Sequence, residues 1–304
     1  MIISLLSANP IQEEVLKQLL SKKLEAVNNL QMAVAKNKSD IIVYPIDYPS
    51  SISAFLRAIS VSDYAVYVLG DSVSAIDAEM TVAIENSSLA GGKVLVLPGA
   101  DVASFDSFFS KYKVGSFDRI NPGDAVVFEE VKPVHHDAYV SIDKHFIVKG
   151  IGNVILGFVL SGTVNKGDRM FLLPSLKEVA VKSIQVMDED VGSAGRGSHV
   201  GLALNNVSDT DMANNYGVSS SKEIADKFPC VFSKSEFYKT DPYSSNILSS
   251  TIRGKSFNMK LAQAANGHEI TFSKPVMRPD GRQIIADSSL SVGKNRIVGS
   301  FEIK

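Results

Sequence analysis

Residues 146–157 read Phe-Ile-Val-Lys-Gly-Ile-Gly-Asn-Val-Ile-Leu-Gly. An apolar run ends at a Gly-x-Gly bend formed by Gly150 and Gly152, and a second apolar run leads from this bend to Gly157. Glycine turns a chain readily, because without a Cβ atom it reaches backbone conformations that other residues avoid. The stretch therefore predicts two β-strands joined by a glycine bend.

Short apolar runs separated by polar or glycine-containing turns continue beyond this stretch and predict further strands. In the middle of the chain the expected strands are 154–160, 169–173, 179–186 and 199–204. From residue 221 onward they include 229–233, 256–261, 269–272 and 296–303, with Arg-Pro-Asp-Gly at 278–281 expected as a hairpin turn. Spacing of this kind is typical of small antiparallel barrels, so we expect two of them.

The first ~120 residues differ, because apolar runs there alternate with helical periodicity in the order β-α-β-α-β. The expected strands are 2–6, 41–43, 64–69 and 93–97, and the expected helices are 13–30, 52–59, 76–89 and 105–112. Such alternation indicates a parallel sheet with helices on both faces, which binds ligands beyond the carboxyl ends of its strands. The predicted fold is a doubly wound α/β domain at 1–125, followed by small antiparallel β-barrels at 135–220 and 221–304.

Composition indicates a soluble multidomain protein of 304 residues, with 45% hydrophobic and 21% charged residues. No run approaches the ~18 apolar residues that a membrane span needs, and residues 2–6 are interpreted as a strand rather than a signal peptide. We therefore expect a cytoplasmic protein without a membrane partner. Cys230 is the only cysteine, which excludes an intramolecular disulfide and a cysteine metal cage, and we predict no metal site.

Charge is distributed unevenly along the chain. Residues 1–130 hold ten Lys/Arg against sixteen Asp/Glu, a balance of −6, and the net charge of −2 leaves +4 for the remainder. A modestly basic C-terminal half is compatible with a nucleic-acid surface, although an ordinary solvated surface explains it as well.

Four segments of the middle barrel together resemble domain 2 of the EF-Tu family. After residues 146–157 come Gly-Thr-Val-Asn-Lys-Gly-Asp at 162–168, the strand around Ile-Gln at 184–185, and Ala-Gly-Arg-Gly-Ser-His-Val-Gly-Leu at 194–202. Residues 41–43, 47–49 and 52–66 extend the match to the archaeal SelB-like group that includes EF-Pyl. The final barrel is matched mainly by its position and by residues 297–303. The resemblance implies an elongation factor of translation with a degenerate GTPase domain.

The motifs that bind GTP in that family are altered at three positions. The phosphate loop reads Ser-Ala-Asn-Pro-Ile-Gln-Glu-Glu at 7–14, without the glycines or the lysine that cradle phosphates. The pattern Asp-x-Pro-Gly-His survives as Asp-Tyr-Pro-Ser-Ser from Asp47, and Asn-Lys-x-Asp survives only in Asp101. We interpret Asp47 and Asp101 as vestigial nucleotide-site positions. We predict no catalytic residue and no cofactor, with GTP and Mg²⁺ as the alternative.

In the EF-Tu family the aminoacyl end of tRNA lies against domain 2. The resemblance implies a pocket wall here formed by Asp143, Lys144, Phe146, Leu156 and His199. An acid suits an α-amino group and an aromatic ring suits stacking. The alternative is that Phe146 and Leu156 belong to the barrel core and that the others are solvated.

Basic residues of the last barrel are candidate contacts to RNA phosphates, with an ordinary solvated face as the alternative. They are Arg278, Arg282, Lys294 and Arg296.

The predicted function is binding of tRNA, aminoacyl-tRNA or another translational RNA, with the ribosome as a further partner, and without GTP hydrolysis. A divergent GTP-hydrolysing elongation factor and a scaffold for protein partners are the two alternatives. The amino acid, the RNA and the oligomeric state stay open.

Overall fold

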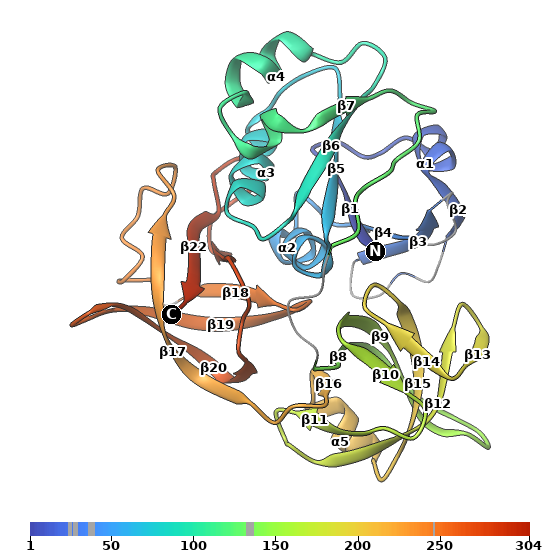
Figure 1. The fold of residues 1–304 in the computed structure, drawn as a ribbon. Helices are drawn as coiled ribbons and strands as arrows, with labels where there is room; N and C mark the ends of the chain where they lie inside the picture. The colour runs from blue at the N-terminus through green and yellow to red at the C-terminus, as the bar shows by residue number, and fades with distance from the viewer. Residues whose placement is uncertain (24–25, 27–29, 36–39, 132–136, 246) are drawn as a thin grey trace. The chain divides into compact units, whose positions relative to one another are not determined.

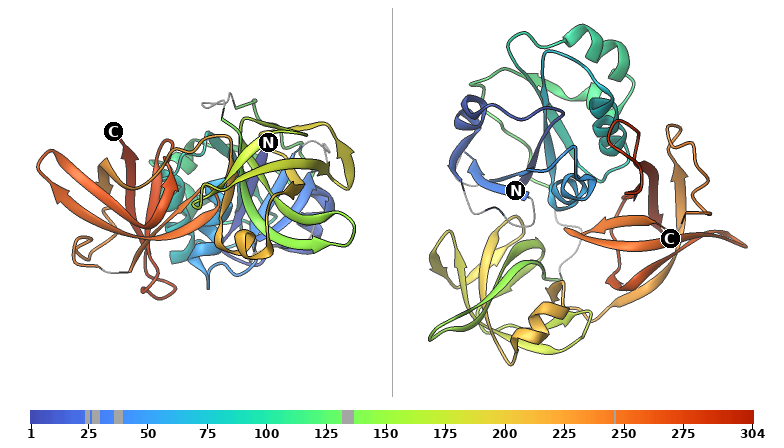
Figure 2. Two further views of the ribbon diagram at one scale, coloured as in Figure 1. Left: turned by 90° about the horizontal axis from the view of Figure 1, so that it is seen from below. Right: turned by 180° about the vertical axis from the view of Figure 1, so that it is seen from behind.

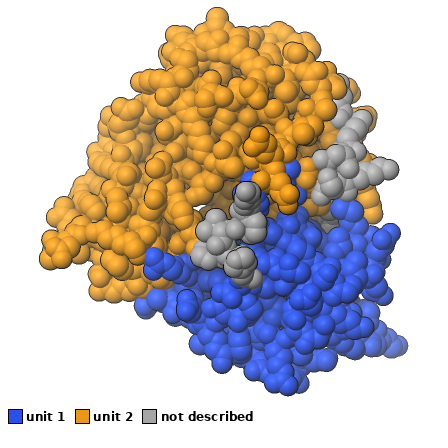
Figure 3. Space-filling model, in the orientation of Figure 1, with its two compact units in different colours: residues 1, 131–226, 274–278 blue, residues 2–130, 227–273, 279–304 orange. Residues whose placement is uncertain are grey.

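The computed structural model describes residues 1–304 except 24–25, 27–29, 36–39, 132–136 and 246. It divides into two compact units (Figure 3). One comprises Met1 and residues 131–226 and 274–278, and the other comprises 2–130, 227–273 and 279–304. The predicted boundaries at 1–125, 135–220 and 221–304 stay predictions. Within the described residues, no helix has the length and hydropathy required to cross a membrane.

The N-terminal α/β domain is built on a seven-stranded sheet in the order β2-β3-β4-β1-β5-β6-β7 (Figure 1). β4, β1, β5, β6 and β7 run parallel, whereas β3 is antiparallel to both neighbours. The strands are β1 (Ile2–Ser7), β2 (Leu20–Lys23), β3 (Leu30–Ala35), β4 (Ile41–Pro45), β5 (Tyr64–Leu69), β6 (Gly91–Val96) and β7 (Asp118–Ile120). The helices are α1 (Glu13–Leu19), α2 (Ile52–Val61), α3 (Ala75–Glu85), α4 (Val102–Phe109) and the 3-10 helix η1 (Lys113–Ser116).

Both faces of this sheet are buried, because successive strand residues point to opposite sides. In β5, Tyr67 joins the apolar cluster under α2, α3 and α4, whereas Val66 and Val68 join the cluster under α1. The predicted doubly wound α/β fold is thus confirmed.

Of the expected helix at 13–30, residues 24–25 and 27–29 lie outside the described residues. The expectation is wrong at 20–23 and at Leu30, because the helix forms only as far as Leu19. α1 ends there, and the chain continues as β2, which pairs antiparallel with β3. Leu19 and Leu20 are both buried, and β3 is buried over nearly its whole length. An apolar strand such as β3 needs a hydrogen-bonding partner on its open side, and β2 supplies that partner. The other three expected helices form, with ends shifted by up to four residues.

The middle barrel lies in the first unit, and its main sheet has the order β11-β16-β8-β9-β15-β12-β13, with β11 also pairing β12. Its apolar core contains Val140, Ile155, Val200 and Leu202. The elements are β8 (Tyr139–Val148), β9 (Gly152–Ser161), β10 (Thr163–Asn165), β11 (Arg169–Leu173), β12 (Glu178–Val186), β13 (Glu189–Val191), β14 (Ser193–Gly195), β15 (His199–Asn205), α5 (Asp209–Asn214) and β16 (Gly217–Ser219).

The C-terminal barrel is closed, in the order β17-β20-β19-β18-β21-β22 (Figure 2). Its strands are β17 (Ile224–Lys234), β18 (Leu248–Ile252), β19 (Lys255–Ala264), β20 (Gly267–Met277), β21 (Gln283–Asp287) and β22 (Ile297–Ile303). Residues 278–281 are not a hairpin turn, because the strands that they connect, β20 and β21, are not neighbours in the barrel. The two predicted barrels are confirmed.

In the second unit, the α/β domain and the C-terminal barrel share one apolar core. Ile284, Ala286 and Ile297 of the barrel pack in the same cluster as residues of α2 and α3. Beside this core Arg296 binds Glu79 of α3, with Nε–Oε1 at 3.0 Å and Nη2–Oε2 at 2.5 Å. Each side chain is only 3% exposed. The two domains are therefore joined by a buried, bidentate ion pair as well as by apolar packing.

We predict that Arg296→Met destabilises the second unit strongly, because it leaves the buried Glu79 carboxylate without its cation. The expected loss in free energy of unfolding is about 3–5 kcal/mol. Urea denaturation measures it. The control is Arg119→Met, which removes an exposed pair with Asp106 and should cost about 1 kcal/mol or less. Equal losses in the two variants would contradict a special role for the buried pair.

Candidate functional site

The carboxyl end of β1 is where the family places its phosphate loop. Here β1 ends at Ser7 and α1 begins at Glu13, and within the described residues Gln12 forms no side-chain cap. Glu13 and Glu14 fill the first helical turn. Acidic residues stabilise the positive end of a helix dipole, but they repel phosphate groups. This turn therefore suits the start of a helix and opposes an anion.

The segment around Asp47 is used to start α2. Asp47 is exposed, and its carbonyl oxygen accepts a hydrogen bond from the Ser51 amide at 2.7 Å. Ser51 then caps α2 by accepting from the Ala54 amide. Tyr48 stacks on Phe55 at 4.3 Å and donates its hydroxyl to Glu79 at 3.3 Å. Burial raises the pKa of Tyr48 far above its usual value, which keeps this hydroxyl a donor.

Asp101 has a structural partner at the start of α4. Its carboxylate accepts a hydrogen bond from the Ser104 amide at 3.1 Å, as an N-cap does. Hydrogen bonds from Ser104 hold the pKa of Asp101 below its usual range. The Asp101 amide donates to the carbonyl of Gly70 at 2.9 Å, which links the residue after β5 to the start of α4. Helix capping therefore explains this aspartate without a nucleotide.

In the middle barrel, Asp143 and His199 are brought together. The β8–β9 register shifts between Ile142 and Lys144, so Asp143 occupies a β-bulge. Its Oδ2 lies 3.4 Å from Nε2 of His199, whose ring meets Phe158 edge-on at 4.9 Å. The Asp143 side chain is 2% exposed and that of His199 is 13% exposed. The result is a nearly buried acid–imidazole pair on β8 and β15.

Gly157 makes room for this bulge. A Cβ atom at position 157 would lie 2.0 Å from the carbonyl oxygen of Ser141, a distance that no carbon–oxygen contact tolerates. The glycine that closes the stretch 146–157 thus allows β8 and β9 to approach each other where Asp143 turns toward His199.

The other three residues of the expected pocket wall differ in exposure and in position along the strands. Lys144 is exposed and lies opposite Leu156, which is half-buried. Phe146 lies nearer the hairpin turn and is 36% exposed, so it does not belong to the barrel core. The sequence did not single out Phe158, although it directly faces His199 in the strand register. Its spacing of two residues from Leu156 is the signal that it shares that face.

The four basic candidates of the last barrel have different surroundings. Arg278 and Lys294 are exposed, as is Arg282, which pairs with Glu302 at 3.2 Å and donates to the carbonyl of Glu85. Arg296 is not a surface residue, because its guanidinium is buried against Glu79. Arg296 is therefore no candidate for contact with RNA phosphates in this structure.

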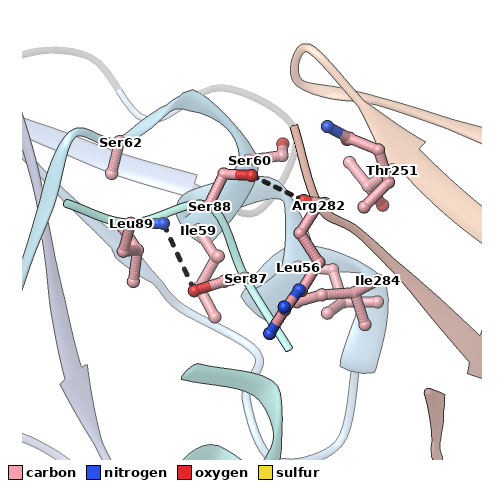
Figure 4. A pocket seen from close by; sticks show the side chains of 11 residues that line it. Leu56, Ile59, Ser60, Ser62, Ser87, Ser88, Leu89, Thr251, Arg282 and Ile284 are labelled. Carbon is pink, nitrogen blue, oxygen red and sulfur yellow. Dashed lines mark hydrogen bonds between the residues drawn. The ribbon is translucent and has the colours of Figure 1, made fainter. Parts of the chain in front are cut away.

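A small pocket of about 70 Å³ lies in the second unit between the α/β domain and the C-terminal barrel (Figure 4). Its hydroxyl groups bond to the protein itself. Ser88 donates to the Arg282 carbonyl at 2.8 Å, and Ser87 accepts from the Leu89 amide at 3.4 Å. This pocket is part of the joint between the two domains.

A larger hollow in the same unit, about 680 Å³, lies beside α3 and α4 and is mostly apolar. Phe108, Phe109, Tyr112 and Phe237 contribute its aromatic walls. Among the described residues, no group of three or more His, Cys, Asp or Glu side chains has the proximity to hold a metal ion.

No family model matches the chain. An uncharacterized protein of Methanocaldococcus jannaschii is 28% identical over 182 residues, which are 58% of this chain and 59% of that protein. The selenocysteine-specific elongation factor of the same organism is 46% identical over 63 residues, 21% of this chain and 13% of the factor. Elongation factor 1-alpha of Thermoplasma volcanium is 30% identical over 81 residues, 27% of this chain and 19% of that factor. The chain thus spans only part of the length of these curated relatives.

Solved structures match over nearly the whole chain. Translation elongation factor SelB of Methanococcus maripaludis, in complex with the GTP analogue GppNHp, has a TM-score of 0.77 at 17% identity, covering 100% of this chain and 78% of that one. A bacterial selenocysteine-specific elongation factor has a TM-score of 0.73 at 13% identity, covering 99% and 57%. The chain has the fold of SelB-type translation factors, and the predicted resemblance to the EF-Tu/SelB class is confirmed.

We predict that Gly157→Ala disrupts the middle barrel, because the new methyl group collides with the backbone of Ser141. The free energy of unfolding should fall by about 3 kcal/mol or more. Gly201→Ala is the matched control, since its Cβ would lie 3.6 Å from Leu156, an ordinary contact. This control should change stability by about 1 kcal/mol or less. Thermal unfolding of both variants checks the prediction, which is wrong if Gly157→Ala melts like the wild type.

Proposed function

We propose that this chain, an EF-Tu/SelB-like elongation factor by fold and sequence likeness, binds tRNA or aminoacyl-tRNA through its barrels without hydrolysing GTP. The ribosome is a further proposed partner and the cytoplasm the proposed location. Similar proteins include selenocysteine-specific elongation factors and elongation factor 1-alpha, which supports a role in translation.

The observation that carries the proposal is the role that residues at the three altered GTPase motifs have in this structure. Residues 7–14 offer acids in place of a phosphate cradle. Ser51 stands where the water-orienting histidine would be, and it caps α2. Asp101 caps α4. Phosphoryl transfer depends almost entirely on positioning and on positive charge at the phosphates, and these residues supply neither.

The middle barrel supplies the proposed site for the end of the tRNA. Lys144 and Phe146 offer an exposed cation and an exposed ring on β8. The Asp143–His199 pair adds an acid and an imidazole to a sheet face that otherwise carries Leu156 and Phe158. Such a wall combines apolar contact with a few fixed polar groups, as ligand sites commonly do.

We predict that a fluorescent GTP analogue shows no saturable binding at micromolar protein, with or without Mg²⁺. The reason is that phosphates meet Glu13 and Glu14 rather than a lysine and backbone amides. Fluorescence titration with competition by GTP and ATP checks it. Saturable micromolar binding with a preference for guanine, and its loss in Asp101→Ala, would instead support the divergent GTPase.

For tRNA, we predict affinity that falls as salt rises, with a log–log slope of about 0.7–0.9 per phosphate contact. Arg278→Ala and Lys294→Ala should each reduce the slope by about 1. His199→Ala should leave the slope unchanged and lower only the preference for aminoacylated over deacylated tRNA, because it acts at the tRNA end. Filter binding across a salt series measures both quantities. If no tRNA is retained even at low salt, the alternative function, a scaffold for protein partners, is favoured instead.

A further inference from the structure

Three aromatic side chains meet at the surface of the C-terminal barrel. They are Phe232 on β17, Tyr243 in the segment between β17 and β18, and His268 at the start of β20. The rings of Tyr243 and His268 are nearly parallel, at 7° and 6.1 Å, and Phe232 meets them edge-on at 6.4 and 5.5 Å. We call these three residues the ring platform.

The ring platform is partly open to solvent. Tyr243 is 37% exposed, and Phe232 and His268 are half-buried. It is also backed by the barrel, because Phe232 pairs in register with Phe301, which is buried and packs on Phe272. Aromatic pairs stabilise each other beyond the burial of their surfaces, so contacts within the platform hold its rings in place. An exposed, preorganised π surface results.

Charges of both signs lie near the platform, and the Tyr243 amide donates to the Asp241 carboxylate at 3.2 Å. Lys234 lies two positions after Phe232, on the same side of β17, and its ammonium is 5.8 Å from the centre of the Tyr238 ring. The Lys304 ammonium donates to the Asn266 carbonyl at 2.6 Å, next to the turn that leads to His268. Residues 221–304 hold thirteen Lys/Arg against eight Asp/Glu, a balance of +5. An anionic partner is therefore favoured on this barrel.

We propose that the ring platform stacks an unpaired nucleobase of single-stranded RNA, with the flanking lysines facing its phosphates. Unpaired bases are recognised on Phe, Tyr and His rings, whereas the paired bases of a duplex are not accessible to stacking. A basic surface that carries aromatic rings is the usual way to bind a single strand without reading its sequence. This inference goes beyond the tRNA-end site on the middle barrel and uses none of its residues.

The test is fluorescence anisotropy with a labelled oligouridylate of about ten nucleotides and with an RNA duplex of the same length. Tyr243→Ala and His268→Ala should each weaken oligouridylate binding about fivefold to a hundredfold, as expected for one lost stacking contact. Tyr243→Phe should bind like the wild type, because it keeps the ring. Duplex binding should not respond to any of these substitutions, and the salt slope of Tyr243→Ala should equal that of the wild type.

The matched control is Phe108→Ala, which removes a ring that is 60% exposed on α4, in the same unit but not part of the ring platform. It should leave oligouridylate binding unchanged. The inference is overturned if Tyr243→Ala binds like the wild type, if Phe108→Ala loses as much, or if the wild type does not bind oligouridylate. If the wild type does not bind oligouridylate but still binds tRNA, only this inference is overturned and the proposed function is unaffected. The converse, oligouridylate binding without tRNA binding, overturns the proposed function alone.

Discussion

The buried ion pair between Glu79 and Arg296 determines how the larger unit is built. Removing two charges from water is costly, and the cost is offset only when geometry is good and further hydrogen bonds are made. Here both guanidinium contacts are direct, and the Arg296 amide also donates to Glu79 at 2.9 Å. The pair therefore fixes the orientation of α3 against the C-terminal barrel more sharply than apolar contacts alone.

Glu79 and Arg296 also contact the segment that follows β4. Tyr48 donates to Glu79, its ring lies 6.0 Å from the Arg296 guanidinium, and the ring stacks on Phe55 of α2. In GTPase switches, loops at this kind of position are ordered by the γ-phosphate and released on hydrolysis. In this chain the segment that follows β4 is held by side chains of the protein itself.

Predictions from local sequence patterns were right, whereas features that depend on partners far away in the sequence were missed. The strands around Gly150, Gly152 and Gly157 depend on turn residues that the sequence displays directly. The helix expected at 13–30 failed because helical spacing of apolar residues does not reveal that β3 requires an antiparallel partner. Arg296 was misplaced for a similar reason, since its partner Glu79 is 217 residues away. The meeting of Asp143 with His199 depends on a bulge that only the strand register shows.

Charge and stacking give an RNA-binding chain two different kinds of contact. Phosphate contacts position an RNA but do not distinguish one strand from another, whereas rings act only on bases that are not paired. Under the proposed function both kinds of contact belong to the barrels, because residues 1–130, with a balance of −6, repel a polyanion. Under the proposed function the α/β domain serves as a folded support, in which Ser51 and Asp101 act as helix caps. Under the proposed function, RNA stays bound for as long as these contacts last, because no hydrolysis of a bound nucleotide times its release.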